Sequence, residues 1–342
     1  MKIAILTLPL HFNYGGILQA FAMCHLLKQM GHEPYIVEER KKGWKTSLKR
    51  ITDRGAIRTF IEKQIPLITT YCFSEDFFEG NQFETVIVGS DQVWRTKFIN
   101  KNFFLPFLKE NYSIKKMAFS ASFGNDQWEC DEYATSLFRE NIATFRAVSV
   151  REYSGVLLCE KYLNIRASWT LDPTMLLPVD VYSSLFSKIH YNIPKYLYIY
   201  ILGYDNSNTK QVVSFIGHHS QYNIKKFHLT HNKLLKRLRS TPGPEEWLSN
   251  IYYSSLILTD SFHACVFSIL FNKPFFVVEN EKGGNTRIDS LLKTFQLENR
   301  KIKDNYKERI SLNESINWSN VNRILNENRE QSHLFLEETL NK

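Results

Sequence analysis

Polar side chains that could do chemistry follow several apolar runs that have the composition of buried β-strands. In the segment LILTDSFHACVFSIL, Asp260, Ser261 and His263 lie between such a run and a second apolar stretch with helical spacing. A histidine at a helix N-terminus is well placed to contact an anion and to transfer a proton near neutral pH. Asp260 could orient its imidazole, and Ser261 could cap the helix. The alternative is a core histidine bonded to the backbone, but the position after a strand favours a catalytic role for Asp260 and His263.

Two arginines are candidates for binding an anion. Arg151 ends the apolar part of AVSVREYSG, and its guanidinium suits bidentate contact with a carboxylate or phosphate. The alternative is a structural ion pair with Glu152 or Asp172. Arg287 lies in the Gly-rich segment EKGGNTRID, at the predicted first turn of a helix. Because a cation there opposes the helix dipole, its position favours a bound anion, and the alternative is a solvated arginine on a surface loop.

Two further segments could bind a hydroxyl-rich ligand. HFNYGG brings Asn13 and Gly15 to a strand-to-helix turn, where small residues let a ligand approach the backbone. TVIVGSDQVW places Asp91 and Gln92 after a strand, and Trp94 could stack on the face of a sugar ring. The alternatives are a plain tight turn, a helix-capping role for Asp91 and a core position for Trp94.

Composition excludes several classes of protein. Of 342 residues, 43% are hydrophobic and 23% are charged, which fits a folded chain and excludes a fibrous or disordered one. No apolar run reaches the roughly 18 to 20 residues of a membrane span. The start MKIAILTLPL is typical of a first strand and not of a signal peptide. Five scattered cysteines disfavour a disulfide framework or a zinc ribbon and fit a reducing cytosol, so we expect a cytoplasmic protein. The sequence contains no G-x-G-x-x-G or Walker motif, so we do not expect a standard dinucleotide or P-loop site.

The charge balance is basic, with 43 Lys and Arg against 35 Asp and Glu, a formal net charge of +8. Two tracts carry much of this excess, residues 40–63 and 225–239. Each could be a solvated face, and the first could lie on an anionic membrane surface or collect an anionic substrate. Nucleic acid is disfavoured as a partner, because no helix-turn-helix, zinc or aromatic RNA-binding motif accompanies the charge.

The order of elements predicts an α/β protein of βαβ units over parallel sheets. The pattern resets around residues 178–194, which predicts a first domain at 1–180 and a second at 181–320. A C-terminal helix at 321–342 could pack back on the first domain. The predicted strands are 2–8, 34–39, 85–90, 116–122, 147–151, 168–171, 196–202, 223–229, 256–261 and 274–279, and the predicted helices are 16–30, 131–144, 154–162, 208–217, 244–254, 263–272, 286–295 and 321–340.

Taken in order, six segments of the chain resemble the polysaccharide pyruvyl transferase family. The resemblance implies two Rossmann-like domains facing across a cleft, as in GT-B glycosyltransferases, with the acceptor on the first domain and the donor on the second. It implies transfer of the carboxyvinyl unit of phosphoenolpyruvate to two hydroxyls of a sugar, giving a pyruvate ketal and free phosphate without a metal or other cofactor. The segments are KIAILTLPLHFNYGGILQAFAMCHLLKQMGH, FETVIVGSDQVW, SVREYSG, LDPTMLL, LTDSFHACVFSILFNKPFFVV and NTRIDSLLKTF.

The resemblance also assigns roles to residues. His263 matches the proposed catalytic histidine of the family, and Arg151 corresponds to an arginine expected to hold the donor. The family has a further donor arginine two residues before the histidine, where this chain has Ser261. Arg287, with Asn285 in the same turn, is our candidate for its replacement in the donor site.

The acceptor implied by the resemblance is a sugar of a cell-surface polysaccharide, such as an exopolysaccharide or capsule, or its lipid-linked precursor. Two other functions stay open on the sequence alone. One is a GT-B glycosyltransferase that uses a nucleotide sugar. The other is a catalytically degenerate member that only binds glycans, for which the serine at position 261 is the best argument.

Overall fold

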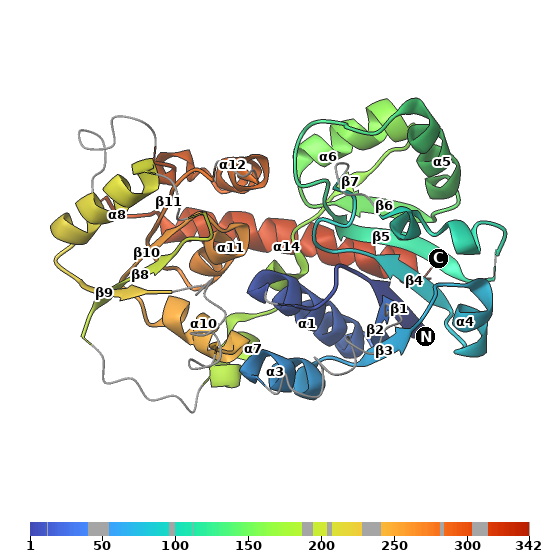
Figure 1. The fold of residues 1–342 in the computed structure, drawn as a ribbon, viewed down its shortest axis with the longest axis horizontal. Coiled ribbons are helices and arrows are strands. Elements are labelled where there is room, and N and C mark those ends of the chain that lie inside the picture. The colour runs from blue at the N-terminus through green and yellow to red at the C-terminus, as the bar shows by residue number, and fades with distance from the viewer. Residues whose placement is uncertain are drawn as a thin grey trace. The chain divides into compact units, whose positions relative to one another are not determined.

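The computed structural model divides the chain into two compact units, which we describe separately (Figure 1). Unit 1 comprises Met1–Leu177 and Asn328–Lys342, and unit 2 comprises Pro178–Glu327. Each unit has one parallel β-sheet. The residues that the structure describes are 1–11, 13–39, 55–95, 100–111, 113–186, 194–203, 207–227, 241–280, 284–302 and 314–341.

Unit 1 has a seven-stranded parallel sheet of order β3-β2-β1-β4-β5-β6-β7. Strands β2 and β3 lie on one side of β1, and β4 to β7 lie on its other side. The order of the strands therefore reverses between β1 and β4, and in such sheets ligands bind outside the carboxyl ends of the strands at this point. The strands are β1 (Lys2–Leu6), β2 (Glu33–Glu39), β3 (Leu67–Thr70), β4 (Thr85–Val88), β5 (Lys115–Ala121), β6 (Ala147–Val150) and β7 (Ser168–Trp169).

The helices of unit 1 follow from local sequence. Helix α1 is apolar around most of its circumference and is buried from Tyr14 to Cys24, as expected for a helix enclosed by other elements. Helices α4 and α5 begin at side-chain caps, in which Ser74 Oγ and Asp131 Oδ1 accept hydrogen bonds from backbone N–H groups of the first turn. The helices are α1 (Tyr14–Gln29), α3 (Ala56–Gln64), α4 (Glu75–Gly80), α5 (Glu132–Ile142) and α6 (Tyr153–Leu158), with short 3-10 or π segments at Lys101–Phe104, Pro106–Leu108, Cys159–Leu163 and Pro173–Met175.

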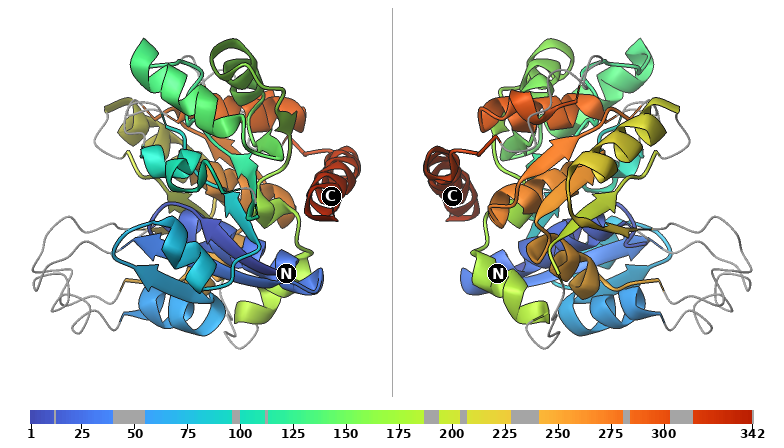
Figure 2. Two further views of the ribbon diagram at one scale, coloured as in Figure 1. Left: turned by 90° about the vertical axis from the view of Figure 1, so that its right-hand side faces the viewer. Right: turned by 90° about the vertical axis from the view of Figure 1, so that its left-hand side faces the viewer.

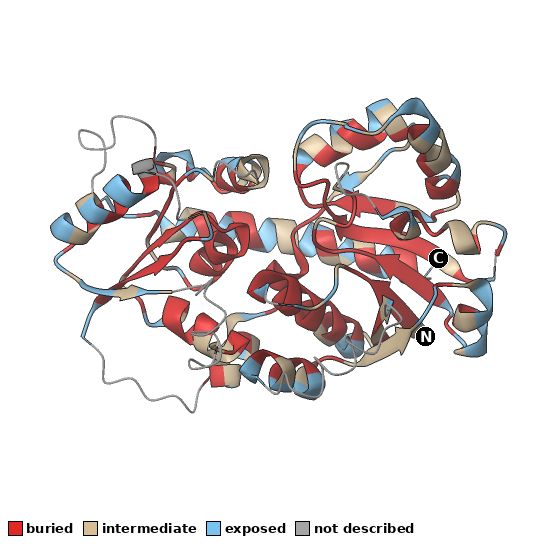
Figure 3. Ribbon diagram, viewed as in Figure 1, coloured by how far each residue is buried: buried red, intermediate tan, exposed pale blue. Residues whose placement is uncertain are grey.

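Unit 2 repeats the arrangement on a smaller scale, with a parallel sheet of order β11-β10-β8-β9. The strand order reverses between β8 and β10, and both of these strands are buried along their whole length (Figure 3). The elements are α7 (Val179–Phe186), β8 (Tyr196–Tyr200), α8 (Ser207–His219), β9 (Asn223–Lys226), α10 (Pro244–Tyr252), β10 (Leu256–Thr259), α11 (Phe262–Leu270), β11 (Phe275–Val277), α12 (Asn285–Thr294) and a 3-10 turn at Glu298–Arg300.

The last helix, α14 (Trp318–Asn341), is the longest one that the structure describes, and Figure 2 shows it nearly end-on. Its residues from Asn328 onwards belong to unit 1. There Ser332 Oγ accepts a hydrogen bond from the Leu171 amide at 3.0 Å, and the Leu340 carbonyl accepts one from Lys115 Nζ at 3.0 Å. No helix in the described ranges combines the length and the apolar character needed to cross a membrane.

The predicted α/β class with parallel sheets is confirmed, and every predicted strand is present with ends shifted by a few residues. Strand β3 and helices α3, α4 and α7 were missed. The short β3, LITT, has no fully buried residue, so its sequence carries little of the apolar signal of a buried strand. Helix α4, EDFFEG, has only six residues, which are too few to show a helical period.

The basic tracts lie largely outside the described residues, which exclude 40–54 and 228–240. The described end of the first tract forms α3, where Ile57, Phe60 and Ile61 are buried. The Phe60 ring lies 5.8 Å from that of Phe21 on α1. The apolar side of this helix therefore packs into unit 1 and does not offer a surface to a membrane.

Lys116 on β5 provides a first test of the packing of unit 1. Its buried Nζ donates to the carbonyls of Leu108, Lys109 and Asn111 at 2.7, 3.3 and 2.8 Å. Because Lys116→Met leaves these carbonyls without their donor, we expect it to lower the free energy of unfolding by about 1–3 kcal/mol. Urea denaturation measures this, with the exposed Lys101→Met as the matched control. Equal stability of the two variants would contradict the described packing.

The cysteines provide a second test, since the structure shows five free thiols in different environments. Burial raises the pKa of Cys24 to about 12 and also raises the pKa of Cys159 and Cys265. Cys72 is exposed. Because only the thiolate reacts, we expect a disulfide reagent at pH 8 to label Cys72 rapidly and these three only on unfolding. Cys130 is half-buried, so the test uses the double variant of Cys72→Ser with Cys130→Ser. This variant should show no rapid phase, and a rapid phase that survives would show that a buried thiol is accessible.

Candidate active site

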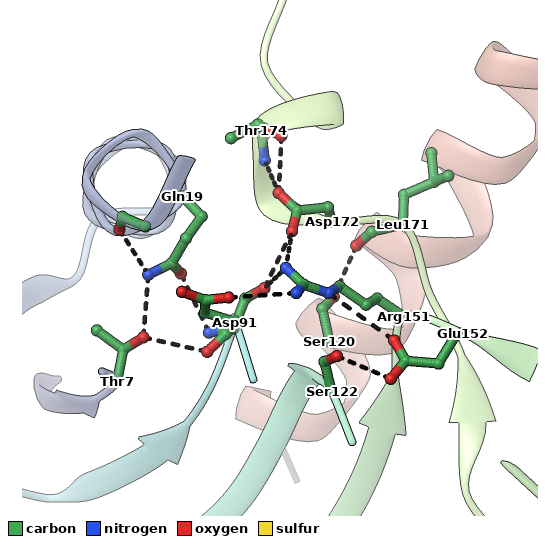
Figure 4. A network of polar contacts seen from close by, with 12 residues as sticks. Thr7, Gln19, Asp91, Ser120, Ser122, Arg151, Glu152, Leu171, Asp172 and Thr174 are labelled. Atoms are coloured by element: carbon green, nitrogen blue, oxygen red, sulfur yellow. Dashed lines mark hydrogen bonds and ion pairs between the residues drawn. The ribbon is translucent and has the colours of Figure 1, made fainter. Parts of the chain in front are cut away.

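The carboxyl ends of four neighbouring strands of unit 1 bring polar side chains together. Asp91 follows β4, Ser122 follows β5, Arg151 and Glu152 follow β6, and Asp172 follows β7. All five side chains are buried, and Figure 4 shows the carboxylates of Asp91, Glu152 and Asp172 around the Arg151 guanidinium, with Ser122 bonded to Glu152. The polar residues that the sequence places after separate strands therefore form one connected network.

Arg151 is the centre of this network, and none of its side chain is exposed. Its Nη1 donates to Asp172 Oδ2 at 2.7 Å, and its Nη2 donates to Asp91 Oδ1 at 3.2 Å. Glu152 Oε2 lies 3.8 Å from Nε. Burial acts to lower the pKa of Arg151, but Asp172, Asp91 and Glu152 together raise the pKa above its ordinary value. The guanidinium is therefore held as a cation by three carboxylates.

Two of these carboxylates have strong anchors besides Arg151. Glu152 Oε1 accepts hydrogen bonds from Ser122 Oγ at 2.7 Å and from the backbone amides of Phe123 and Gly124 at 2.8 and 3.1 Å. Asp172 Oδ1 accepts hydrogen bonds from the Thr174 amide at 3.0 Å and from its hydroxyl at 2.7 Å. These bonds fix Glu152 and Asp172 to the backbone of the loops that carry them.

Gln19 on α1 braces the loop that carries Asp91. Its Oε1 accepts a hydrogen bond from the Ser90 amide at 3.2 Å, and its Nε2 donates to Thr7 Oγ1 at 3.0 Å and to the Gly16 carbonyl at 2.9 Å. Thr7 in turn donates to the Ser90 carbonyl at 3.1 Å (Figure 4). A fully buried amide thus joins the ends of β1 and β4 to the first turn of α1.

Asp91 lies where the strand order of unit 1 reverses. Its Oδ2 is 3.5 Å from Nδ2 of Asn13, the exposed residue that precedes α1. A Cβ atom on Gly16 would lie 3.2 Å from the same oxygen, so the glycine lets the carboxylate approach the helix N-terminus closely. The backbone of Asp91 has φ 64°, a left-handed conformation that costs energy and that occurs often at functional sites.

The other predicted acceptor residues have different surroundings. Gly15 is buried in the first turn of α1. Gln92 is half-buried, and its amide lies over Gly124, where an added Cβ would come within 2.5 Å of Oε1. Trp94 has no exposed surface: it stacks on Phe104 at 5.4 Å, and its Nε1 donates to the Phe103 carbonyl at 3.1 Å. The structure therefore corrects the stacking role of Trp94, which is a core residue.

The structure also corrects the expected contact between Arg151 and a donor. The sequence left open a structural ion pair with Glu152 or Asp172, and the guanidinium contacts both of these carboxylates as well as that of Asp91. Its side chain is completely buried among these carboxylates, so a donor would have to displace one of them to reach the guanidinium.

In unit 2, Asp260 joins the ends of three strands. It follows β10, and its carboxylate accepts hydrogen bonds from the amides of Leu202 and Gly203 after β8, at 2.7 and 2.8 Å, and from Nδ2 of Asn280 after β11, at 2.9 Å. Burial raises the pKa of Asp260, and these hydrogen bonds oppose the rise. In the described part of the chain its hydrogen bonds do not go to His263, which corrects the expectation that it orients the imidazole.

Asn280 extends this clamp to the start of α12. Its backbone N–H donates to Asn285 Oδ1 at 3.0 Å, and Asn285 Nδ2 donates to the backbone carbonyl of Asn280 at 3.1 Å. This reciprocal pair ties the end of β11 to the first turn of α12. Asn280 therefore links the predicted donor residue Asn285 to Asp260.

His263 and Arg287 lie in the first turns of α11 and α12, and both lie near the ring of Phe262. His263 is buried in the first turn of α11, with its ring 5.2 Å from that of Phe262. The Arg287 guanidinium lies over the Phe262 ring, with Cζ 5.6 Å from the ring centroid. Arg287 is half-buried, in contrast to Arg151, and Ser261 caps α11 by accepting a hydrogen bond from the Ala264 amide at 3.5 Å.

The two clusters differ in what they can bind. The cluster in unit 1 has three carboxylates around one buried guanidinium, which suits hydroxyl groups better than an anion. The cluster in unit 2 combines a partly exposed arginine, a histidine and two helix N-termini, which suits an anion. Among the described residues, no group of His, Cys, Asp and Glu is arranged to hold a metal ion.

The residues of the clusters that the sequence analysis did not single out include Gln19, Asn280 and Gly203. Gln19 is a lone polar residue within the apolar run GILQAFAM, and that isolation was a usable signal. Asn280 directly follows an apolar strand, as Asp91 and Asp260 do. Gly203 carried no usable signal, because its proximity to Asp260 and Asn280 depends on the pairing of β8 with β10.

Comparison with solved structures supports the class of fold. The chain is similar to S. aureus MnaA in a structure with UDP (TM-score 0.55, 12% identity, 95% of this chain and 87% of that chain). It is also similar to the UDP-GlcNAc 2-epimerase from Methanocaldococcus jannaschii (TM-score 0.53, 12% identity, 95% and 92%). A third similar structure is a glycosyltransferase from Rickettsia africae (TM-score 0.50, 11% identity, 97% and 93%). The protein thus has the α/β fold of GT-B-like enzymes.

Sequence comparison defines the family. The model of the polysaccharide pyruvyl transferase family matches residues 13–282, which include Asn13, Asp91, Arg151, Asp260 and His263. The chain belongs to the polysaccharide pyruvyl transferase family. No curated protein sequence gives a significant match.

The core position of Trp94 leads to a test that separates packing from sugar binding. Trp94→Phe keeps an aromatic ring but loses volume and the hydrogen bond to Phe103, and Trp94→Ala removes the ring. We expect the alanine variant to lose about 3–5 kcal/mol of unfolding free energy and the phenylalanine variant less. Urea denaturation measures both. Unchanged stability together with weakened sugar binding would show that the ring contacts ligand.

Proposed function

We propose that this protein transfers the carboxyvinyl group of phosphoenolpyruvate to two hydroxyls of a sugar and so forms a pyruvate ketal. The acceptor in this proposal is a sugar of a cell-surface polysaccharide or of its lipid-linked precursor. The observation that carries the proposal is the grouping of Arg287, His263 and two helix N-termini in unit 2 of a family member. Phosphoenolpyruvate bears a phosphate and a carboxylate, and this grouping offers a cation and the positive ends of two helix dipoles to both.

The reaction makes a defined demand on His263. A proton must reach the methylene carbon of phosphoenolpyruvate, so that positive charge develops at the carbon that bears the phosphate oxygen. One sugar hydroxyl adds to that carbon, and the second displaces phosphate. Of the two hydroxyl protons, one ends on the new methyl group and the other leaves with phosphate. We assign the proton transfer to His263, since histidine is the side chain that most often serves as general acid or base in enzymes.

Arg287 takes the donor-binding role that the resemblance gave to position 261. Arg287 is half-buried, and its guanidinium lies over the ring of Phe262, the residue before His263. Asn285 and Asp260 support this role indirectly, since their hydrogen bonds hold the first turn of α12 against the ends of β10 and β11. We assign the acceptor hydroxyls to Asp91, Asn13 and Gln92 in unit 1.

The proposal includes a cytoplasmic location with peripheral contact to an anionic membrane, through basic residues outside the described ranges. Flotation with vesicles that contain phosphatidylglycerol tests this contact. Salt-sensitive binding to these vesicles and not to neutral ones is expected, and equal recovery from both would contradict it.

Substitutions in unit 2 test the chemistry. We expect His263→Ala to lower kcat by about 10²- to 10⁴-fold, because a proton-transfer group is lost. We expect Arg287→Ala to raise the KM for phosphoenolpyruvate by about 10- to 100-fold, because a charge-assisted hydrogen bond is lost. Phosphate release measures turnover, and mass spectrometry of candidate lipid-linked sugars detects the ketal adduct.

The matched controls are the exposed His218→Ala and Arg323→Ala of the same unit, which should keep wild-type kinetics. Wild-type turnover by His263→Ala would refute the assignment of the histidine. Stabilisation of the wild-type protein by UDP-GlcNAc and not by phosphoenolpyruvate, in a thermal-shift panel, would refute the donor.

A further inference from the structure

The charge balance around Arg151 sets a limit on what unit 1 can bind. The carboxylates of Asp91, Glu152 and Asp172 surround one guanidinium, and each of these side chains is at most 2% exposed. Burying negative charge in excess of positive charge is costly, and an additional anion would raise that cost. A phosphorylated carboxylate is therefore a poor ligand for this network, and a neutral hydroxyl is a good one.

The three carboxylates depend on Arg151 to different degrees. Glu152 and Asp172 are also anchored by backbone amides of their own loops. Asp91 has no comparable anchor among the described residues, because its one other side-chain contact is with Asn13 at 3.5 Å, the outer limit of a hydrogen bond. The orientation of the Asp91 carboxylate is therefore set mainly by Arg151.

The position of Asp91 makes that orientation relevant to a ligand. One oxygen, Oδ1, faces Arg151, while Oδ2 lies beside Asn13 and the N-terminus of α1. This is the place between β1 and β4 where parallel sheets of this kind bind their ligands. Asn13 is exposed, so its weak contact with Oδ2 can be replaced by a hydroxyl of a ligand.

We propose that Arg151 is a positioning residue that holds Asp91 so that Oδ2 accepts a hydrogen bond from a hydroxyl of a neutral sugar. The excess of carboxylates makes this site selective for neutral sugars over anionic ones. Arg151 takes no part in binding the phosphorylated donor. The inference rests on the proposed function in one respect, namely that the sugar is the acceptor of the transfer.

Binding measurements separate this role from a donor-binding role. The variants are Arg151→Met, Arg151→Lys, Asp91→Asn and the double variant of Arg151→Met with Asp91→Asn. The matched control is Arg139→Met, which removes an arginine of the same unit that donates to the Tyr162 carbonyl. Ligand-observed NMR gives the Kd for neutral methyl glucoside, galactoside and mannoside and for methyl glucuronide, and calorimetry gives the Kd for phosphoenolpyruvate.

We expect Arg151→Met and Asp91→Asn each to weaken the best neutral glycoside by about 10- to 100-fold, or beyond detection, as for loss of a charge-assisted hydrogen bond. The double variant should be no weaker than Asp91→Asn, because Arg151 acts through Asp91. Arg151→Lys should fall between wild type and Arg151→Met, since one ammonium cannot bridge both carboxylates as the planar guanidinium does. Arg139→Met should bind as wild type does, and wild type should prefer neutral glycosides to the glucuronide.

Three results would overturn the inference. One is a tenfold or greater loss of phosphoenolpyruvate affinity in Arg151→Met, which would make Arg151 a donor ligand. Another is an additive loss of glycoside affinity in the double variant, which would show that Arg151 does not act through Asp91. The third is equal binding of glycosides by wild type and variants, including no binding by any of them. If Arg151→Met does not fold, Arg151→Lys and Asp91→Asn decide by the same criteria.

Failure of the proposed function has a different signature. In that case the wild type binds no phosphoenolpyruvate, and Arg287→Ala changes nothing. The glycoside measurements then decide the inference by themselves, because none of them requires a donor.

Discussion

A single buried guanidinium organises the functional end of unit 1. Arg151 joins the loops after β4, β6 and β7 through Asp91, Glu152 and Asp172. Removing one partner from such a buried charge network leaves another charge without compensation, which costs several kcal/mol in typical proteins. The conformation of the loops at the carboxyl edge therefore depends on Arg151. An arginine committed in this way is poorly placed to bind a substrate anion as well, and the proposed function therefore assigns the anion to another part of the chain.

In unit 2 the loops at the carboxyl ends of the strands are held together by hydrogen bonds to one carboxylate, that of Asp260. Asp260 connects the ends of β8, β10 and β11 through two backbone amides and Asn280. This leaves Arg287 partly exposed beside Phe262 and His263. In both units an aspartate follows the strand at which the strand order reverses. In unit 1 the aspartate, Asp91, forms an ion pair with a buried arginine. In unit 2 the aspartate, Asp260, accepts hydrogen bonds from neutral donors. This difference divides the molecule into a region suited to hydroxyls and a region suited to an anion.

The sequence predicts much of this arrangement, because apolar strands followed by polar residues are visible without a structure. The segments around Asp91, Arg151 and Asp260 were found in this way. Their partners were harder to predict. Arg151 donates to both Asp91 and Asp172, and this depends on how the loops after β4 and β7 approach each other in the folded sheet. Trp94 shows the same limit: the motif suggests a ligand contact, whereas its stacking on Phe104, ten residues away and in a 3-10 turn, buries it. Local sequence identifies which residues are polar or aromatic, and long-range packing decides whether they face a ligand or the core.

The most direct test of the division of charge is a crystal structure with phosphoenolpyruvate bound. The account predicts the phosphate and carboxylate at the N-termini of α11 and α12, with Arg287 within hydrogen-bond distance and Arg151 still paired with Asp172 and Asp91. Phosphoenolpyruvate bound to the Arg151 guanidinium, with the Asp91 pair broken, would contradict it.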